Sequence, residues 1–140
     1  MKTIFQKPLI LDGAMGTELT KKGIKTPLPL WSAIANEENY NEVVDIHKCY
    51  IDNGCNIITT NTFRTTERTY KKAGYKNSFL ASNNSSDLAI KAANEARKNH
   101  DTLIAYSIAP LEDCYSPDLF PGMETAVEEF AQLGEWLIDA

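Results

Sequence analysis

The chain has 140 residues, of which 43% are hydrophobic and 24% charged, as is usual for a globular domain with its own core. Its net charge of −5 disfavours nucleic acid as a partner, and no apolar run approaches the roughly 18 residues of a membrane-spanning helix. Residues 1–7 lack the apolar core of a signal peptide, so we expect a cytoplasmic protein with no membrane partner.

The first predicted element is a strand at Leu9-Ile10-Leu11, because three consecutive aliphatic residues are typical of a strand buried on both faces of a parallel sheet. Asp12 follows directly, and then Gly13 and Gly16, whose backbone can take a positive φ. Asp12 has two interpretations. It accepts a hydrogen bond from the amino group of a ligand, or it caps the next turn by accepting from a backbone N–H.

A loop is predicted next. Residues 20–26 are polar, and Pro27 and Pro29 exclude a helix interior. The loop is long enough to fold over a site. Trp31, near its end, is interpreted either as a lid contact or as an apolar plug.

The spacing of Asn39 and Glu42 predicts a capping box that opens a helix. The apolar face of that helix consists of Val43, Ile46, His47, Tyr50 and Ile51. Gly54 is expected to end it as the C′ residue. We interpret His47 as a hydrogen-bonded core residue, with a catalytic role as the alternative.

A second strand is predicted at residues 56–60, continuing into Asn61-Thr62-Phe63-Arg64, and a second helix at residues 66–73, closed by Gly74. After a linker at residues 75–81, the cluster Asn83-Asn84-Ser85-Ser86 is rich in N-cap residues and predicts the start of a third helix. The apolar stripe of this helix is narrow and consists of Leu88, Ala89, Ala92, Ala93 and Ala96.

A third strand is predicted at residues 102–108, and a last helix from Glu124 onward. Residues 99–140 carry 9 acidic side chains and no basic one, whereas residues 1–98 carry 14 basic and 10 acidic side chains. Apolar residues are interleaved through the acidic segment, so we interpret it as a solvated helix face and not as an interaction tail.

The order β-α-β-α-α-β-α predicts parallel strands with helical crossovers, in either a barrel or an open doubly wound sheet. In both folds ligands bind at the carboxyl ends of the strands, so residues 12–13, residues 60–63 and Ser107 are expected on one rim. No nucleotide-binding pattern is present. Three strands leave both sheet edges open, which indicates a piece of a larger fold and favours self-association.

Five ordered segments resemble those of the homocysteine S-methyltransferase family: residues 10–19, 29–33, 46–55, 59–63 and 107–110. This resemblance implies an α/β fold of the (β/α)8 TIM-barrel type with a parallel sheet. Residues 1–140 would be the N-terminal part of the homocysteine-binding barrel domain, with about three strands and no internal domain boundary.

The resemblance also implies a substrate site. Asp12 and Gly13 would hold the amino-acid part of homocysteine, and Asn61, Thr62 and Phe63 would line the same pocket, with Thr60 just behind. The family activates the homocysteine thiol on zinc held by three cysteines, one in a later strand and an adjacent pair near the C-terminus. The three cysteines of this chain, Cys49, Cys55 and Cys114, match none of these positions. We therefore expect neither a metal site nor a catalytic residue within the chain.

Two functions stay open. In the first, the chain is the substrate-recognition part of a zinc-dependent enzyme that moves a methyl group from a small donor, such as S-methylmethionine or S-adenosylmethionine, to homocysteine and so makes methionine. In the second, it is a non-catalytic half-barrel that acts as an assembly or interaction module.

Overall fold

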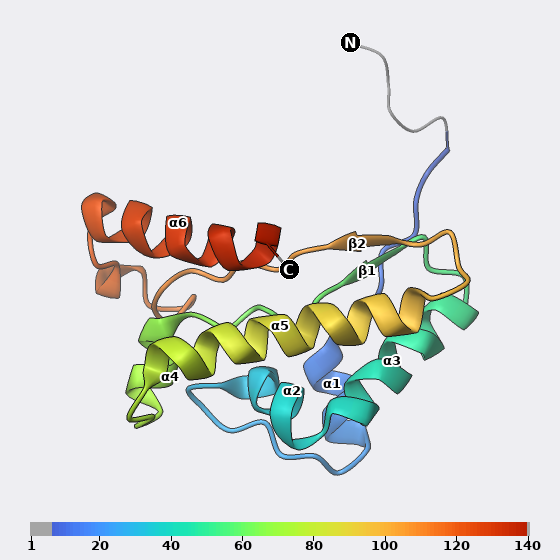
Figure 1. The fold of residues 1–140 in the computed structure, drawn as a ribbon, viewed down its shortest axis with the longest axis horizontal. Coiled ribbons are helices and arrows are strands. Elements are labelled where there is room, and N and C mark those ends of the chain that lie inside the picture. Colours follow the sequence, from blue (N-terminus) through green and yellow to red (C-terminus); the bar gives the residue numbers. More distant parts are fainter. Residues whose placement is uncertain (1–6, 140) are drawn as a thin grey trace.

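The computed structural model describes residues 7–139, which form an α/β fold around a small parallel sheet (Figure 1). Its helices are α1 (Met15–Lys21), α2 (Ala35–Glu38), α3 (Tyr40–Asp52), α4 (Glu67–Lys72), α5 (Ser78–Arg97) and α6 (Met123–Asp139). Two short 3-10 helices are η1 (Trp31–Ile34) and η2 (Pro117–Leu119). The strands are β1 (Ile57–Thr59) and β2 (Leu103–Ala105).

The sheet of the described residues has two strands, and the predicted first strand is a single bridge. β1 and β2 pair in parallel, with Ile57 opposite Leu103 and Thr59 opposite Ala105. Leu11 forms an isolated parallel bridge with Ile57. The prediction that residues 9–11 are buried on both faces is wrong, because Ile10 and Leu11 are each 58% exposed and no second layer of residues 7–139 covers them.

The two faces of this sheet have different surroundings. Ile58 is fully buried in the main core, where Ile104 packs against it, so this face meets the helices. The opposite face carries Leu11, Ile57 and Leu103 in register, and Leu103 is 44% exposed. One face of the sheet therefore lacks an apolar cover among the described residues.

Helix α5 crosses the middle of the molecule, with α6 and the sheet along one side and α1, α2 and α3 along the other (Figure 1). The predicted alanine stripe allows this central position, because Ala92 and Ala93 are fully buried and admit close neighbours. The main core consists of Leu19, Ala35, Val43, Val44, Ile46, Ile51, Ile58, Ala92, Ala93 and Ala96. A smaller core of Ile90, Leu133 and Leu137 holds α6 against α5.

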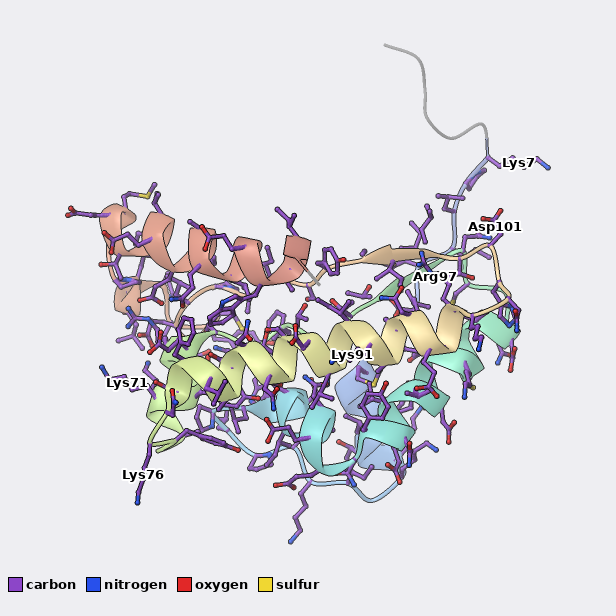
Figure 2. The ribbon with its side chains drawn as sticks, in the orientation of Figure 1. Lys7, Lys71, Lys76, Lys91, Arg97 and Asp101 are labelled. Carbon is purple, nitrogen blue, oxygen red and sulfur yellow. The ribbon has the colours of Figure 1, made fainter. Side chains whose placement is uncertain are left out.

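Four of the charged side chains labelled in Figure 2 mark the two ends of α5. Lys71 and Lys76 project where α4 is followed by α5, whereas Arg97 and Asp101 lie at the far end of α5. Asp101 precedes β2 and so lies at the amino end of that strand. Asp101 thus lies away from the carboxyl ends of the strands, where a site is expected.

The predicted ends of α3 and α4 are confirmed. Gly54 follows α3 with φ +94°, and Gly74 follows α4 with φ +85°, as C′ glycines do. Thr66 caps α4, because its side chain accepts from the backbone N–H of Thr69. The predicted capping box of α3 is wrong in part: Asn39 is the N-cap residue, but its side chain makes no capping bond.

Helix α5 begins earlier than predicted. Asn77 is its N-cap, with Oδ1 accepting from the backbone N–H of Leu80 at 3.2 Å. The polar cluster at residues 83–86 lies inside the helix, and most of the predicted linker at 75–81 belongs to its first turns. Ser85 and Ser86 are fully buried and bond to neighbouring elements, so tertiary packing has overridden their preference for a cap.

Helix α1 and the short helix α2 were not predicted. Gly16 and the threonines of α1 are weak helix formers, and the helix is stabilised by Leu19, which is fully buried, and by Met15, which packs on the same core. The predicted loop at residues 20–32 is correspondingly shorter at both ends.

Candidate functional site

An open cleft of about 740 Å3 lies at the carboxyl ends of the strands. Its lining comes from the segment after Leu11, from the Trp31 region and from the ends of β1 and β2. Of the predicted rim residues, Asp12, Gly13, Thr60, Asn61, Phe63 and Ser107 line the cleft. The structure thus brings together residues that are far apart in the chain.

Asp12 joins the first segment to β1 through its side chain. The backbone N–H of Asp12 donates to Ile57 O at 3.0 Å, as in a parallel ladder. At the next step of the ladder, the backbone N–H of Thr59 donates to Asp12 Oδ2 at 2.7 Å, and the Thr59 hydroxyl donates to Oδ1 at 2.8 Å. The carboxylate therefore substitutes for a main-chain acceptor at the point where the first segment leaves the sheet.

This geometry is consistent with a part of each of the two interpretations of Asp12. The carboxylate does accept from a backbone N–H, but that N–H belongs to β1 and not to the following turn. Each oxygen retains a second lone pair beside the cleft, so a ligand ammonium has an acceptor there. Burial raises the pKa of the Asp12 carboxyl, and the hydrogen bonds from Thr59 partly oppose this rise.

Gly13 packs closely against the side chain of Tyr50. A Cβ added at Gly13 would lie 2.7 Å from the Tyr50 hydroxyl oxygen, closer than carbon and oxygen approach without displacement. The predicted use of a positive φ at Gly13 and Gly16 is wrong, since neither glycine adopts it. Gly13 lets the backbone run directly between the cleft and the side chain of Tyr50.

Thr60 and Thr62 differ from the predicted arrangement. Thr60 lines the cleft, whereas Thr62 is fully buried and lies outside the lining. The Thr62 hydroxyl donates to Ser107 O at 2.7 Å and accepts from Ser107 N at 3.1 Å. Thr62 therefore ties the carboxyl end of β1 to the segment after β2, and its neighbour Thr60 bonds to it at 2.8 Å.

Asn61 belongs to a buried amide network that sequence reasoning missed. Asn61 Nδ2 donates to Ser32 O at 2.7 Å and to Asn36 Oδ1 at 2.8 Å. Asn36 Nδ2 in turn lies within bonding distance of Asn61 O, Ser85 O and Ser85 Oγ. No local pattern in the sequence separates Asn36 from an exposed asparagine, yet it fixes the Trp31 region against β1 and α5.

Trp31 and Phe63 form an aromatic wall of the cleft. Their rings stack with centroids 6.0 Å apart and planes 10° apart, and both residues are half-buried. Trp31 has φ +49°, a left-handed conformation that costs a bulky residue on the order of 1 kcal/mol. Trp31 is thus a wall of the site, which differs from both the lid and the plug interpretation.

His47 and the cysteines lie outside the cleft lining. His47 is fully buried, as predicted, but neither ring nitrogen has a hydrogen-bond partner among the described residues, so the predicted hydrogen bonding is wrong. Cys49 and Cys114 are exposed, and burial raises the pKa of the Cys55 thiol.

Metal-ligating side chains do not gather in the described part of the chain. Within it, no three His, Cys, Asp or Glu side chains could hold an ion together. The residues present therefore do not fit the tetrahedral thiolate set that zinc takes. No helix of residues 7–139 is long and apolar enough to cross a membrane.

The family model and the relatives that this chain resembles agree with one another. The family model described as Homocysteine S-methyltransferase matches residues 9–138. Homocysteine S-methyltransferase 3 of Zea mays is 31% identical over 90 residues, which are 64% of this chain and 26% of the maize protein. Homocysteine S-methyltransferase 2 of Saccharomyces cerevisiae is 34% identical over 70 residues, or 43% of this chain and 22% of the yeast protein.

A solved structure agrees over nearly the whole chain. The metallated form of the homocysteine methyltransferase MmuM from Escherichia coli superposes with a TM-score of 0.81 at 26% identity. The match covers 96% of this chain and 51% of MmuM, so the chain spans about half the length of that relative.

Proposed function

Because the chain belongs to the homocysteine S-methyltransferase family, we propose that its cleft binds homocysteine as the recognition part of a methyltransferase that makes methionine. The observation that carries the proposal is the cleft itself, where Asp12 meets Asn61 and Phe63 of the segment after β1 at the carboxyl ends of the strands. In β/α folds this edge is where substrates bind.

The chemistry of the cleft suits an amino acid with a short apolar chain. The Asp12 carboxylate, held in place by Thr59, accepts from the ammonium group of homocysteine. The stacked rings of Trp31 and Phe63 offer an apolar surface to its two methylene groups. The chain's own contribution is thus to bind and orient the substrate.

The remainder of the barrel and its cofactor enter the proposal only because the chain belongs to the family. A (β/α)8 barrel, in which residues 1–140 form the N-terminal part of one domain, would supply zinc to hold the homocysteine sulfur as a thiolate. The methyl donor is a small molecule such as S-methylmethionine or S-adenosylmethionine. The described residues hold no zinc ligand set, so their part ends at recognition.

Substitution of Asp12 tests the proposal. Asp12→Asn is expected to weaken homocysteine binding about tenfold to hundredfold, because a charged hydrogen bond of roughly 1.5–3 kcal/mol is lost. The fold should persist, since an asparagine oxygen still accepts from Thr59 N and its amide can donate to the Thr59 hydroxyl. Calorimetric titration of the 140-residue chain measures the affinity, and thermal unfolding measures the stability.

Asp101→Asn is the matched control, because it removes a carboxylate from the amino end of β2 and should leave homocysteine affinity unchanged. An Asp12→Asn variant with wild-type affinity and a lower melting temperature would show a purely structural carboxylate.

The uncovered face of the sheet favours a second candidate, an assembly module formed by two copies of the chain. Leu11 and Leu103 are exposed in register on that face. Among the charged side chains, residues 1–98 have an excess of basic ones and residues 99–140 carry acidic ones only, so the two segments attract each other between copies.

In this case the chain is expected to dimerise at micromolar concentration, and Leu103→Lys to weaken the dimer roughly tenfold or more by placing a charge in an apolar contact. Leu119→Lys, at an exposed leucine in η2, is the control. Light scattering that finds a compact monomer of the unaltered chain would remove this candidate.

A further inference from the structure

Arg64 is a buried cation that the proposed function does not use. Its side chain follows Phe63 at the end of β1, and the residue is only 7% exposed. Among the described residues the ion pairs leave Arg64 out. Burying a charged group without a counter-charge costs several kcal/mol of folding free energy. An anion bound next to Arg64 would offset this cost.

The hydrogen bonds of the guanidinium show which of its nitrogens lack a partner among the described residues. Nη1 donates to Glu112 O at 3.0 Å. Nε is fully buried and has no partner, and Nη2 bonds to none of the described residues without being fully buried. Nε and Nη2 point along the same edge of the guanidinium, and this edge is the one that binds a carboxylate with two parallel hydrogen bonds.

The carboxylate of Glu112, whose main chain contacts Arg64, is already engaged. Glu112 contacts Arg64 through its main-chain oxygen only, whereas its carboxylate pairs with Arg68 and Lys72. These two cations lower the pKa of the Glu112 carboxyl, opposed in part by burial. Arg64 therefore keeps its positive charge uncompensated while a carboxylate beside it is held by other residues.

Arg64 also lies against the wall of the cleft. Its Cζ is 5.1 Å from the centroid of the Trp31 ring and 5.4 Å from that of Phe63. Both rings line the cleft, whereas Arg64 itself is not part of the lining, and Trp31 holds its place in a left-handed backbone conformation. The guanidinium thus makes the aromatic wall electropositive, on a part of the cleft other than the Asp12 carboxylate.

We infer that the unpartnered Nε/Nη2 edge of Arg64 binds the carboxylate of a ligand seated in this cleft, while Asp12 accepts from the ammonium group of the same class of ligand. The inference rests on the proposed function for the identity of the ligand, which is an amino acid or an amino-acid-derived methyl donor. A carboxylate that reaches Nε displaces the rings packed on the guanidinium, so the environment of Trp31 changes on binding.

The first experiment uses acetate as a plain carboxylate probe. Trp136→Phe leaves Trp31 as the single tryptophan, and its fluorescence is recorded while acetate replaces chloride at constant ionic strength. We expect a saturable change in this chain and none after the further substitution Arg64→Gln. Arg97→Gln, an arginine at the far end of α5, is the control that keeps the response. No saturable change with Arg64 present would overturn the inference.

The second experiment identifies the source of the carboxylate by calorimetry. The ligands are homocysteine, 3-aminopropane-1-thiol (the same molecule without its carboxylate) and S-methylmethionine. Arg64→Gln is expected to weaken homocysteine about tenfold to hundredfold and to leave the aminothiol unchanged. A loss confined to S-methylmethionine assigns the carboxylate to the donor and supports the inference equally. An equal loss for homocysteine and the aminothiol would show a structural role and overturn it.

The two hypotheses fail separately. An acetate response without homocysteine binding rejects the proposed function and keeps the anion site. Homocysteine binding without an acetate response does the reverse. Should Arg64→Gln fail to fold, the acetate titration of the Trp136→Phe chain still decides the matter.

Discussion

An Asn36→Ala variant is expected to lose at least about 3 kcal/mol of its free energy of unfolding, which lowers the melting temperature by roughly 10 °C. The side chain of Asn36 contacts Asn61 and Ser85 through both its amide nitrogen and its oxygen, all of it buried. Truncation leaves several buried polar groups without partners, each at a cost of about 1–3 kcal/mol. Thermal and denaturant unfolding measure the loss.

The same variant should also loosen the cleft. Asn36 orients Asn61, whose amide holds the main chain at Ser32, next to Trp31. We therefore expect altered Trp31 fluorescence in the folded variant, recorded in a Trp136→Phe chain. Asn84→Ala is the control, because Asn84 is exposed on α5 and its removal should change stability by no more than about 0.5 kcal/mol. Equal stability of the two variants would contradict the network's importance.

Sequence patterns predicted those parts of the fold that local chemistry determines. α3 and α4 are each followed by a glycine, and Gly54 and Gly74 adopt the positive φ that ends a helix. The rim was predictable for a similar reason, since parallel strands bring their carboxyl ends to one edge. Asp12, Thr60 and Ser107 accordingly line one cleft, although they come from three different segments.

The remaining features depend on contacts between distant segments. Ser85 and Ser86 are cap-forming residues by themselves, but hydrogen bonds to Asn36 and Thr65 make them part of α5. The aliphatic residues Ile10 and Leu11 indicate a buried strand only if a second layer covers them, and the described residues supply none. The Asn36 network and the Arg64 site involve long-range partners, which no sequence periodicity reveals.

The unpaired histidine leads to the second large effect, a loss of stability in mild acid. His47 is fully buried and neither ring nitrogen is hydrogen-bonded within the described part of the chain. Burial lowers the pKa of His47 from 6.5 to about 4, because the charged imidazolium would lack both water and a partner. The folded protein therefore keeps His47 neutral at pH values where the unfolded chain protonates it.

The direction of the effect follows from proton binding. Above pH 6.5 both states hold a neutral imidazole and the full stability is present. Between pH 6.5 and about 4 the unfolded state binds one proton more than the folded state, so the free energy of unfolding falls as the pH falls. A shift of this size corresponds to a total loss of about 3 kcal/mol.

His47→Leu should abolish this part of the pH dependence. Leucine is similar in volume and has no titrating group, and no hydrogen bond to the described residues is lost with the imidazole. Denaturant unfolding at pH 7.5, 5.5 and 4.5 is expected to show the gap between variant and wild type shifting by about 1.4 kcal/mol per pH unit below 6.5. His100→Gln is the control, because it removes a histidine from an exposed site, and its stability should change with pH as that of the wild type does. Parallel pH profiles for His47→Leu and wild type would contradict this, because they would show that the folded protein protonates His47 as readily as the unfolded chain does.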